Sequence, residues 1–545
     1  MPLIAAHQIA PRDADIVIYN GYDAAKTLEI EHITSAIDCA HAQLAYEVML
    51  GLQAPAMEMM LRGFRVDPIE REKAIKRIKE KKQRLEVILS RFTAAITGKP
   101  YNEKFPNSGK QLRELFYERM NLKPIEKKNR KTGLIERPMD RATLERLADE
   151  HFYAEPIANA VLLHRNFTGF LEDLETLLDG DGRWRTSFNL TGTTTFRWSA
   201  SKSGLGSGGN LQNITEQNRI IFIADQGCKL CGIDAEQSEA RDVGWFCGTI
   251  LGKWKYLDTI ESGDIHTRVA RMCWPELAWT GDIGRDRQIA DQRFYRWHTR
   301  RDTTKRLGHG SNYKGKPLTM STQTKIPLSI VRPFQERYFD AFPEIPEMHR
   351  WHAEKLQRDR CVVNCFGLRR DFFDRPESDE TIKGAIANSF QSATFLRVGL
   401  GLWRLWKYMG TRIQLLTQLH DANYFQYRLD DDEDELIKEA LEHMKVTHYH
   451  KLPDGTLRKF TVPCEVQVGF NWAHRWRLRE DGTREDWNPR GLDRWARKAQ
   501  SGASAQAQLK AVGDCNTTSL YLMHRPEDAA ALGRVLLRAR NNAEA

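Results

Sequence analysis

The spacing of apolar residues along the chain predicts a protein built from both helices and strands. Across Glu47–Leu178 apolar positions recur at helical spacing, for example within Lys73–Phe92, where they accompany a strongly basic face. Apolar runs of strand length follow at Ile220–Ile233, Ile413–Tyr427 and Val462–Val468. A mostly helical block, Gln237–Arg404, separates the first two runs. The pattern therefore indicates an α+β fold.

Composition narrows the class of protein. The chain has 545 residues and a net charge of +9, with 41% hydrophobic and 28% charged residues. This balance excludes a wholly disordered or fibrous chain, and the length allows about three or four domains. A basic chain with 14 Trp, 15 Tyr and 23 Phe is compatible with nucleic-acid binding, although many unrelated proteins share that composition.

The sequence argues against a membrane or secreted protein. Apolar stretches fall short of the ~20 residues that cross a bilayer, and the first residues lack a basic segment leading into an apolar one. Nine cysteines are an odd count for a disulfide-linked secreted chain. Cys228 and Cys231 lie in a predicted strand, where a buried cysteine is more ordinary than a zinc ligand. We expect a reducing, cytoplasmic setting.

Two aspartates, Asp234 and Asp421, each follow an apolar strand. Side by side they would repel unless cations lay between them, and their hard oxygen ligands suit Mg²⁺. Such a pair could hold two metals for phosphoryl displacement. A lone aspartate at such a junction is more commonly a turn or cap residue, and spacing alone cannot bring the two together. The acidic run Asp430–Glu435 is typical of a helix start.

A four-residue repeat places Arg301, Lys305, His309 and Tyr313 along one drifting helix face. The two cations could hold a triphosphate, and the two rings could meet sugar and base. Glycines on both sides of His309 would each cost about 1 kcal/mol in a helix interior, so their small size needs a use, such as close approach of a base pair. The alternative is a solvated basic helix that ends before these rings.

Short motifs occur in a fixed order along most of the chain. They are Phe105–Leu112, Thr195–Ser199, Asn210–Ile214, Asp234–Arg241, Asp264–Thr267, Arg301–Tyr313, His420–Asp421 and Pro463–Trp472. In this order they resemble the thumb segment, the Thr-Gly-Arg-Leu-Ser and Asn-Leu-Gln-Asn-Ile segments, motif A, the Asp-Ile-His segment, motifs B and C, and the closing strand of family A DNA polymerases. Each motif is weak, but their ordered occurrence between about residues 50 and 474 is specific.

The resemblance implies a right-hand architecture with an antiparallel-sheet palm, helical fingers and a helical thumb. The implied domains are a remnant of an exonuclease-like region (1–45), the thumb (46–178), the palm (179–255 and 395–490), the fingers (256–394) and a linker with a C-terminal tail (491–545).

The resemblance also implies a role for individual residues. Asp234 and Asp421 would bind two Mg²⁺ ions with help from the Ala235 carbonyl, Mn²⁺ being a substitute, and Lys305 would donate a proton to pyrophosphate. The residues implied to bind the nucleotide are Arg301, Lys305, His309, Tyr313, Gln237, Glu239 and His266. The residues implied to bind DNA are Arg197, Asn210, Gln212, Asn213, Gln391 and His420. Glu239 would crowd the 2′ position of the sugar and exclude ribonucleotides.

Four residues depart from the family pattern. His309 stands where the family has Phe or Tyr, Gly308 where it often has Asn, and Phe196 where it has Gly. Ala422 stands where motif C usually ends in Glu, so an auxiliary carboxylate is missing. The two aspartates would then have to suffice.

The expected function is template-directed DNA synthesis, in which a primer 3′ end is extended with dNTPs by two-metal phosphoryl transfer in replication or repair. Partners would be primer–template DNA and dNTPs, with a separate exonuclease, helicase or processivity factor as optional additions, in a bacterial host or phage-infected cell. Tyr19 and Asp23 fit an exonuclease pattern, but residues 1–45 lack its carboxylate pair, so intrinsic 3′–5′ proofreading is not expected.

Two alternatives to this function stay open. A single-subunit RNA polymerase-like enzyme shares the same palm, although Glu239 argues against it. A non-catalytic DNA-binding relative is compatible with Ala422 and His309, although the retained Asp234, Asp421 and Lys305 argue against it.

Overall fold

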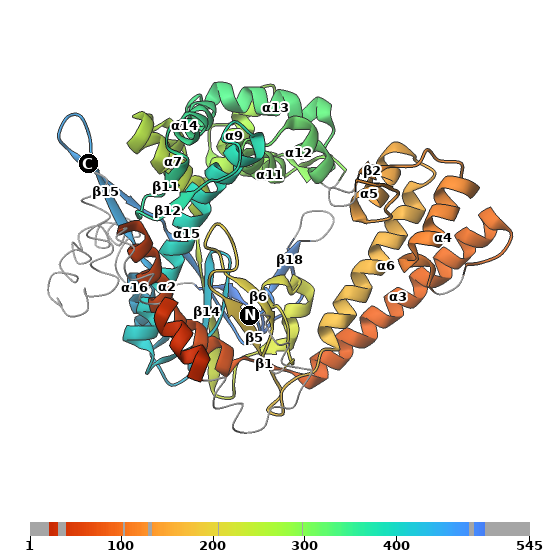
Figure 1. Cartoon of the computed structure of the whole chain (residues 1–545), viewed down its shortest axis with the longest axis horizontal. Coiled ribbons are helices and arrows are strands. Elements are labelled where there is room, and N and C mark those ends of the chain that lie inside the picture. The colour runs from red at the N-terminus through yellow and green to blue at the C-terminus, as the bar shows by residue number, and fades with distance from the viewer. Residues whose placement is uncertain are drawn as a thin grey trace.

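The structure is a computed structural model, and it describes residues 21–30, 40–101, 104–128, 133–204, 206–296, 298–478 and 484–495. Figure 1 shows a sheet with helices against it, a group of helices above the sheet, and two long helices standing to one side. This mixture of helices with antiparallel strands confirms the predicted α+β class. Residues 1–20, which include Tyr19, and most of the predicted tail lie outside the described residues.

The largest sheet is antiparallel and has the strand order β13-β14-β8-β17-β20. Its strands are β13 (Ile413–Leu419), β14 (Ala422–Arg428), β8 (Cys228–Ala235), β17 (Cys464–Gly469) and β20 (Asp493–Arg494). The predicted strand–turn–strand at Ile413–Tyr427 is therefore confirmed. The strand predicted near Val462–Val468 exists, but β20 pairs with it from beyond residue 490, so the sheet extends past the predicted end of the palm.

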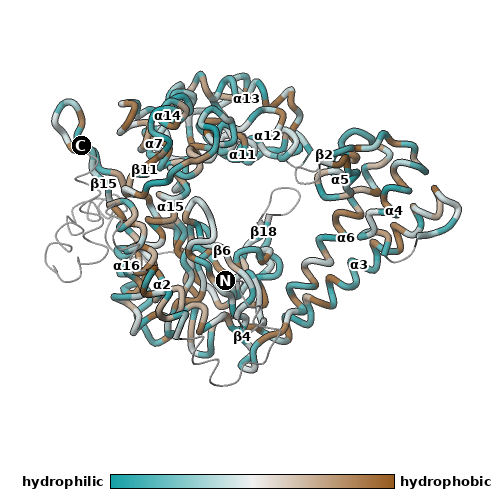
Figure 2. The backbone as a smooth tube through the Cα atoms, in the orientation of Figure 1, coloured by the Kyte–Doolittle hydropathy of each residue, from teal (hydrophilic) through white to brown (hydrophobic). Residues whose placement is uncertain are grey.

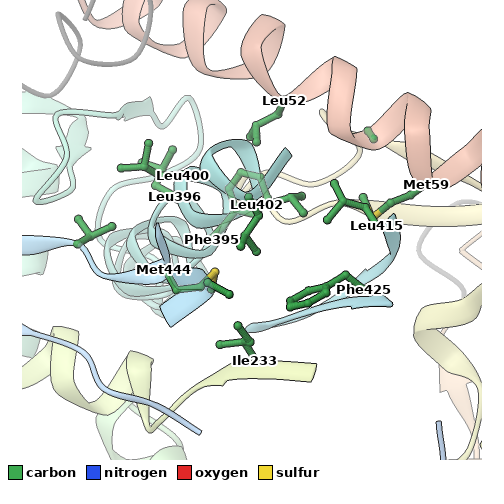
Figure 3. Close-up of a cluster of buried hydrophobic side chains, with 14 of the residues drawn as sticks. Leu52, Met59, Ile233, Phe395, Leu396, Leu400, Leu402, Leu415, Phe425 and Met444 are labelled. Atoms are coloured by element: carbon green, nitrogen blue, oxygen red, sulfur yellow. The ribbon is translucent and has the colours of Figure 1, made fainter. Parts of the chain in front are cut away.

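Three helices cover one face of this sheet. They are α2 (Ala40–Arg62), α15 (Asp379–Met409) and α16 (Glu433–Met444). Figure 3 shows Ile233, Leu415 and Phe425 of the strands meeting Leu402 of α15, with Met59 of α2 beside them. α2 packs here although the sequence placed most of it in the thumb, and α15 crosses the predicted fingers–palm border at residue 394 as one helix.

The two long helices at the side are α3 (Pro68–Thr97) and α6 (Glu155–Leu174). Asp67 caps α3 by accepting from the backbone N–H groups of Ile69 and Glu70, and Gly98 ends it at φ 80°. Figure 2 shows hydrophilic and hydrophobic turns alternating along both helices, as expected for helices that pack on one face. The helix predicted around Lys73–Phe92 is therefore confirmed.

Several short elements pack together at one end of α3 and α6. They are α4 (Gly109–Arg113), the π-helical turn η2 (Glu114–Arg119), β2 (Lys127–Lys128), β3 (Ile135–Glu136) and α5 (Arg141–Glu150). Their buried core includes Phe105, Leu115, Phe116, Leu144 and Val161. The side chain of Lys325, which follows α12 in the upper helical group, lies 2.7 Å from Asp149 of α5.

The upper group contains most of the remaining helices. They are α7 (Ser238–Leu251), α8 (Lys255–Glu261), α9 (Ile265–Cys273), α10 (Ile283–Ala290), α11 (Arg300–Asn312), α12 (Pro317–Thr324), α13 (Leu328–Ala341) and α14 (Glu344–Asp359). Apart from α10, these helices share a buried core that includes Val243, Leu307, Val331 and Phe334, together with Phe390 of α15.

α11 runs through both of its glycines to Asn312, so the alternative of a helix ending before the rings is wrong. A Cβ at Gly310 would lie 2.6 Å from the sulfur of Met320, so α12 packs closely against this glycine and a larger residue would displace the Met320 side chain. A Cβ at Gly308 would lie at an ordinary 3.5 Å from the ring of Tyr338. Packing against α12 thus gives the small residue at Gly310 a use within the protein, and the close approach of a base pair stays a prediction.

Short strands and turns lie around these groups. One three-stranded sheet joins β1 (Phe64–Val66), β4 (Arg183–Trp184) and β7 (Phe222–Ile223). Two-stranded pairs are β5 (Thr186–Asn189) with β6 (Ser199–Lys202), β9 (Arg293–Tyr295) with β10 (His298–Thr299), β11 (Cys361–Val363) with β12 (Arg369–Asp371), β15 (Thr447–Lys451) with β16 (Leu457–Thr461), and β18 (Trp476–Leu478) with β19 (Arg484–Asp486). The 3-10 turns are η1 (Phe105–Asn107), η3 (Leu211–Asn213) and η4 (Glu216–Ile221). None of the helices in the described part of the chain is both long and apolar enough to span a bilayer.

Candidate active site

The fold brings Asp234 and Asp421 together at one edge of the large sheet. Asp234 is the next-to-last residue of β8, and its direct partner on β14 is Ala422. His420 and Asp421 form the two-residue turn between β13 and β14, with His420 at φ 55°. The Gln418 amide donates to the His420 carbonyl at 2.7 Å, and the Ala235 N–H donates to the Asp421 carbonyl at 3.0 Å.

The electrostatics of this pair favour a bound cation. Partial burial, the Asp421 charge and neighbouring carboxylates raise the pKa of Asp234 to about 7, while the Lys305 charge opposes the shift. Burial and then the charge of Glu239 raise the pKa of Asp421. Asp234 keeps an exposed surface, so water softens these interactions. Hard carboxylate oxygens that repel one another are a donor set that Mg²⁺ fits.

Glu465 is a neighbour of this pair that sequence reasoning missed. It is the direct partner of Asp234 on β17, so Ala422 and Glu465 flank Asp234 from the two adjacent strands on the same face. Its charge contributes to the raised pKa of Asp234. The strand itself was predicted, but its pairing partner had no signal in the sequence. Across the described ranges, no group of three or more His, Cys, Asp or Glu side chains is placed to hold one metal ion.

We expect Asp234→Asn to stabilise the metal-free protein at alkaline pH. A raised pKa means that the folded state holds the Asp234 proton more tightly than the unfolded state does. The stability that this group contributes is therefore fully present below its ordinary pKa of about 4 and lost as the pH rises through about 7. Discounted for solvent exposure to about 1 kcal/mol, the gain in EDTA at pH 8 is about 1–2 °C in Tm.

Thermal unfolding of both proteins between pH 4 and pH 8 in EDTA measures this difference, which should shrink to nothing at the acid end. Asp430→Asn is the matched control, because hydrogen bonds from Arg428 lower the pKa of Asp430 and its removal should not stabilise at pH 8. A variant at Asp234 that is less stable than the wild type at pH 8 would contradict the expectation.

The predicted basic face lies on α11 and its C-terminal cap, Tyr313. Thr299 caps the helix by accepting from the Asp302 N–H. The Lys305 and His309 side chains are exposed, Arg301 is half-buried, and the His309 and Tyr313 rings lie 4.8 Å apart between centroids. Because the charge of Lys305 lowers the pKa of Asp234, this face lies near the two aspartates. The structure thus places the Lys305 cation within electrostatic reach of Asp234.

His266 lies on α9 beside the first turn of α11. The Thr304 hydroxyl donates to the His266 carbonyl at 3.0 Å. Burial, with the nearby charge of Arg301, lowers the pKa of His266 to about 4. The imidazole is therefore neutral at physiological pH and available as a hydrogen-bonding group.

Glu239 ties three segments together. It lies in the first turn of α7, and its carboxylate contacts both the Arg197 guanidinium and the Tyr313 hydroxyl. Gln237, the N-cap residue of α7, has φ 53°, and among the described residues its buried side-chain oxygen meets no hydrogen-bond donor. Phe196, just before Arg197, has φ 64°, a backbone region that favours glycine, so Phe196 stands where the resemblance places a glycine and keeps a glycine-like backbone conformation.

The predicted DNA-binding residues lie on several separate elements. His420 and Arg197 lie near Asp421, since the charges of Arg197 and Asp421 both act on the pKa of His420, which burial lowers. Gln391 is half-buried on α15, next to Phe390, whose ring meets that of Tyr313 edge-on. The other three lie on or beside η3, which packs against β6 and β13: Asn210, Gln212 and Asn213. There the Asn210 side chain caps η3 by accepting from the Gln212 N–H at 2.8 Å.

Curated proteins similar to this chain are DNA polymerases. The chain is 29% identical over 438 residues to the thermostable DNA polymerase I of Thermus aquaticus, a match covering 78% of this chain and 47% of that protein. It is 25% identical over 385 residues to DNA polymerase I of Helicobacter pylori strain J99, covering 68% and 38%. The chain thus spans less than half the length of these curated relatives.

A solved structure shares the fold. It is the POL domain of Pol1 from M. smegmatis in complex with DNA primer-template and dNTP, with a TM-score of 0.60 and 21% identity over 78% of this chain and 70% of that chain. This likeness confirms the predicted architecture. The model of DNA polymerase family A matches residues 75–476, most of the chain. This chain therefore belongs to DNA polymerase family A.

Proposed function

We propose that this chain is a template-directed DNA polymerase that extends a primer 3′ end with dNTPs and releases pyrophosphate. The observation that carries the proposal is the pairing of Asp234 and Asp421 at the sheet edge, close to the cationic face of α11. This arrangement suits a nucleoside triphosphate as substrate. Its phosphates are negatively charged, so the basic side chains can contact them directly, while divalent cations are needed between the phosphates and the carboxylates. The family membership supports the same reaction.

Asp234 and Asp421, with the Ala235 carbonyl, would hold two Mg²⁺ ions. When bound, these ions supply charge neutralisation and activation of the primer hydroxyl. Arg301 and Lys305 would orient the triphosphate, and Lys305 would donate a proton to the departing pyrophosphate. Neutral His266 would donate a hydrogen bond to a phosphate oxygen, and Arg197 and His420 would lie beside the primer end.

Primer extension on a labelled primer–template tests the proposal. We expect extension with dNTPs and Mg²⁺, none in EDTA, and little with NTPs. Efficient synthesis from NTPs without a primer would instead support the RNA polymerase-like alternative. Tight duplex binding without extension in any of these mixtures would support the non-catalytic alternative.

The proposed activity is synthesis without intrinsic proofreading, in replication or repair in the cytoplasm of a bacterial host or phage-infected cell. A separate exonuclease, a helicase or a processivity factor would be its protein partners. Incubation of the chain with a mismatched, end-labelled primer–template and no dNTPs tests the absence of proofreading. Shortening of the primer would contradict that absence.

Glu239→Ala is expected to relax sugar discrimination. Its carboxylate is held in place by Arg197 and Tyr313, so it cannot easily move away from a 2′-hydroxyl. Removing it should lower the ratio of kcat/KM for dNTP to that for the matching NTP by about 10- to 100-fold. Glu239→Gln, which keeps the size of the side chain, is the matched control and should keep most of the discrimination. An unchanged ratio in Glu239→Ala would contradict a steric role.

A further inference from the structure

The carboxylate of Asp264 serves two helices at once. It caps α9 by accepting from the backbone N–H groups of His266 at 3.1 Å and Thr267 at 3.4 Å, and from the Thr267 hydroxyl at 2.9 Å. It also accepts from Nε of Arg301 at 2.9 Å and from Nη2 of Arg301 at 3.3 Å. One carboxylate thus joins the start of the helix that carries His266 to the first turn of the helix that carries Lys305.

The geometry of this ion pair leaves the outer edge of Arg301 open to a ligand. Because Asp264 takes the Nε side of the guanidinium, the Nη1 amine and the second N–H of Nη2 are not engaged by it. The Arg301 side chain is 28% exposed, whereas that of Asp264 is 15% exposed. The carboxylate is therefore the buried anchor, and the cation is the part that faces outward.

Asp264 is charged at physiological pH, as an anchor of a cation must be. Burial acts to raise its pKa, but the hydrogen bonds and charge of Arg301 outweigh burial and lower the pKa below its ordinary value. The Thr304 hydroxyl adds a second tie between the two helices through the His266 carbonyl. The orientation of Arg301 is thus set by groups on both helices.

We propose that Asp264 is a positioning residue that holds the Arg301 guanidinium in the orientation that receives the triphosphate of the incoming nucleotide. The inference rests on the proposed function, whose substrate supplies that triphosphate. A free arginine side chain loses rotamer freedom when it binds phosphate, and an arginine already held by a buried carboxylate loses less. Asp264 thereby strengthens nucleotide binding without touching the nucleotide.

The alternative to positioning is competition, in which Asp264 and phosphate compete for the Arg301 guanidinium. Competition predicts that loss of the carboxylate tightens nucleotide binding, whereas positioning predicts that it weakens binding. The side-on geometry favours positioning, because a phosphate can approach the outer edge while the ion pair stays formed.

The test measures dNTP affinity of the complex between the full chain and a primer–template whose primer ends in a dideoxynucleotide, so that no chemistry follows. Asp264→Ser keeps a side chain that caps helices well but does not reach Arg301. We expect it to weaken binding of the correct dNTP by about 10-fold, Arg301→Ala to weaken it at least as much, and the double variant to match Arg301→Ala alone. With an extendable primer, Asp264→Ser should raise KM for dNTP by the same factor and leave kcat within about 2-fold.

Asp282→Ser is the matched control. Asp282 caps α10 by accepting from the Arg285 N–H at 2.8 Å, and the described contacts give it no cationic partner, so its replacement should leave dNTP affinity unchanged. Additive losses in the double variant, or tighter binding by Asp264→Ser, would overturn the inference. The two proposals can fail separately. If dNTP binding on the blocked primer shows the expected coupling between Asp264 and Arg301, but the wild type never extends an open primer, the proposed function is wrong and the role of Asp264 stands.

Discussion

Replacing Asp421 by alanine is expected to reduce single-turnover primer extension by about 10³-fold or more, corresponding to roughly 4 kcal/mol of transition-state stabilisation. Asp421 stands in a tight turn whose backbone is fixed by hydrogen bonds from Gln418 and Ala235. The adjacent position on β14 is Ala422, which offers no carboxylate in its place. Loss of Asp421 would leave Asp234, with Glu465 beside it on β17, to face the metals and the triphosphate.

The measurement should separate chemistry from binding. Affinity for the primer–template, followed by fluorescence anisotropy, is expected to stay within about 2-fold because Asp421 is expected to act through the metals rather than through DNA. Asp421→Asn should behave like the alanine variant, since a neutral amide keeps the shape but loses the charge. Asp430→Ala, at an exposed position just beyond the other end of β14, is the control and should retain full activity. Activity within 10-fold of wild type in Asp421→Ala would contradict the proposed catalytic pair.

Breaking the ion pair between Asp242 and Arg397 is expected to destabilise the fold by about 3–5 kcal/mol. These side chains are each 2% exposed and join α7 to α15 through contacts of 2.7 and 2.9 Å. Burial raises the pKa of Asp242 even though Arg397 opposes the shift, which reflects how much the carboxylate loses on leaving water. Removing either partner would leave the other charge buried without compensation.

Equilibrium urea unfolding of Arg397→Met and Asp242→Leu measures this cost. The double variant should recover part of the loss, because neither buried charge then remains. Arg428→Met is the control: its pair with Asp430 has side chains 73% and 69% exposed, so no measurable loss of stability is expected. A loss below about 1 kcal/mol in both buried variants would show that the pair is better solvated than its position indicates.

The buried pair also bears on the proposed site. Ser238 and Thr394 extend its hydrogen bonds, and Ser238 is adjacent in the chain to Glu239. A variant that loosens this network is therefore expected to affect sugar discrimination as well as stability, which sets it apart from a surface substitution.

Features that depend on near neighbours in the chain could be predicted from the sequence. The basic helix within α3, the four-spaced face of α11, the acidic helix start at Asp432–Glu435 and the strand–turn–strand of β13 and β14 all follow from local spacing, capping and turn chemistry. The motifs added the family, which the match over residues 75–476 confirms. The roles implied for single residues stay predictions.

Tertiary structure alone decided which distant residues meet. Glu465 stands beside Asp234 because of the register between β17 and β8, and Asp264 anchors Arg301 because α9 packs against α11. α2 lies on the palm sheet, where its apolar face is buried against α15 and β13. A helix face is set by backbone hydrogen bonds between residues four apart, so the local sequence determines it. Strand register and helix packing are chosen by which surfaces bury the most apolar area over the whole chain, and no short segment carries that information.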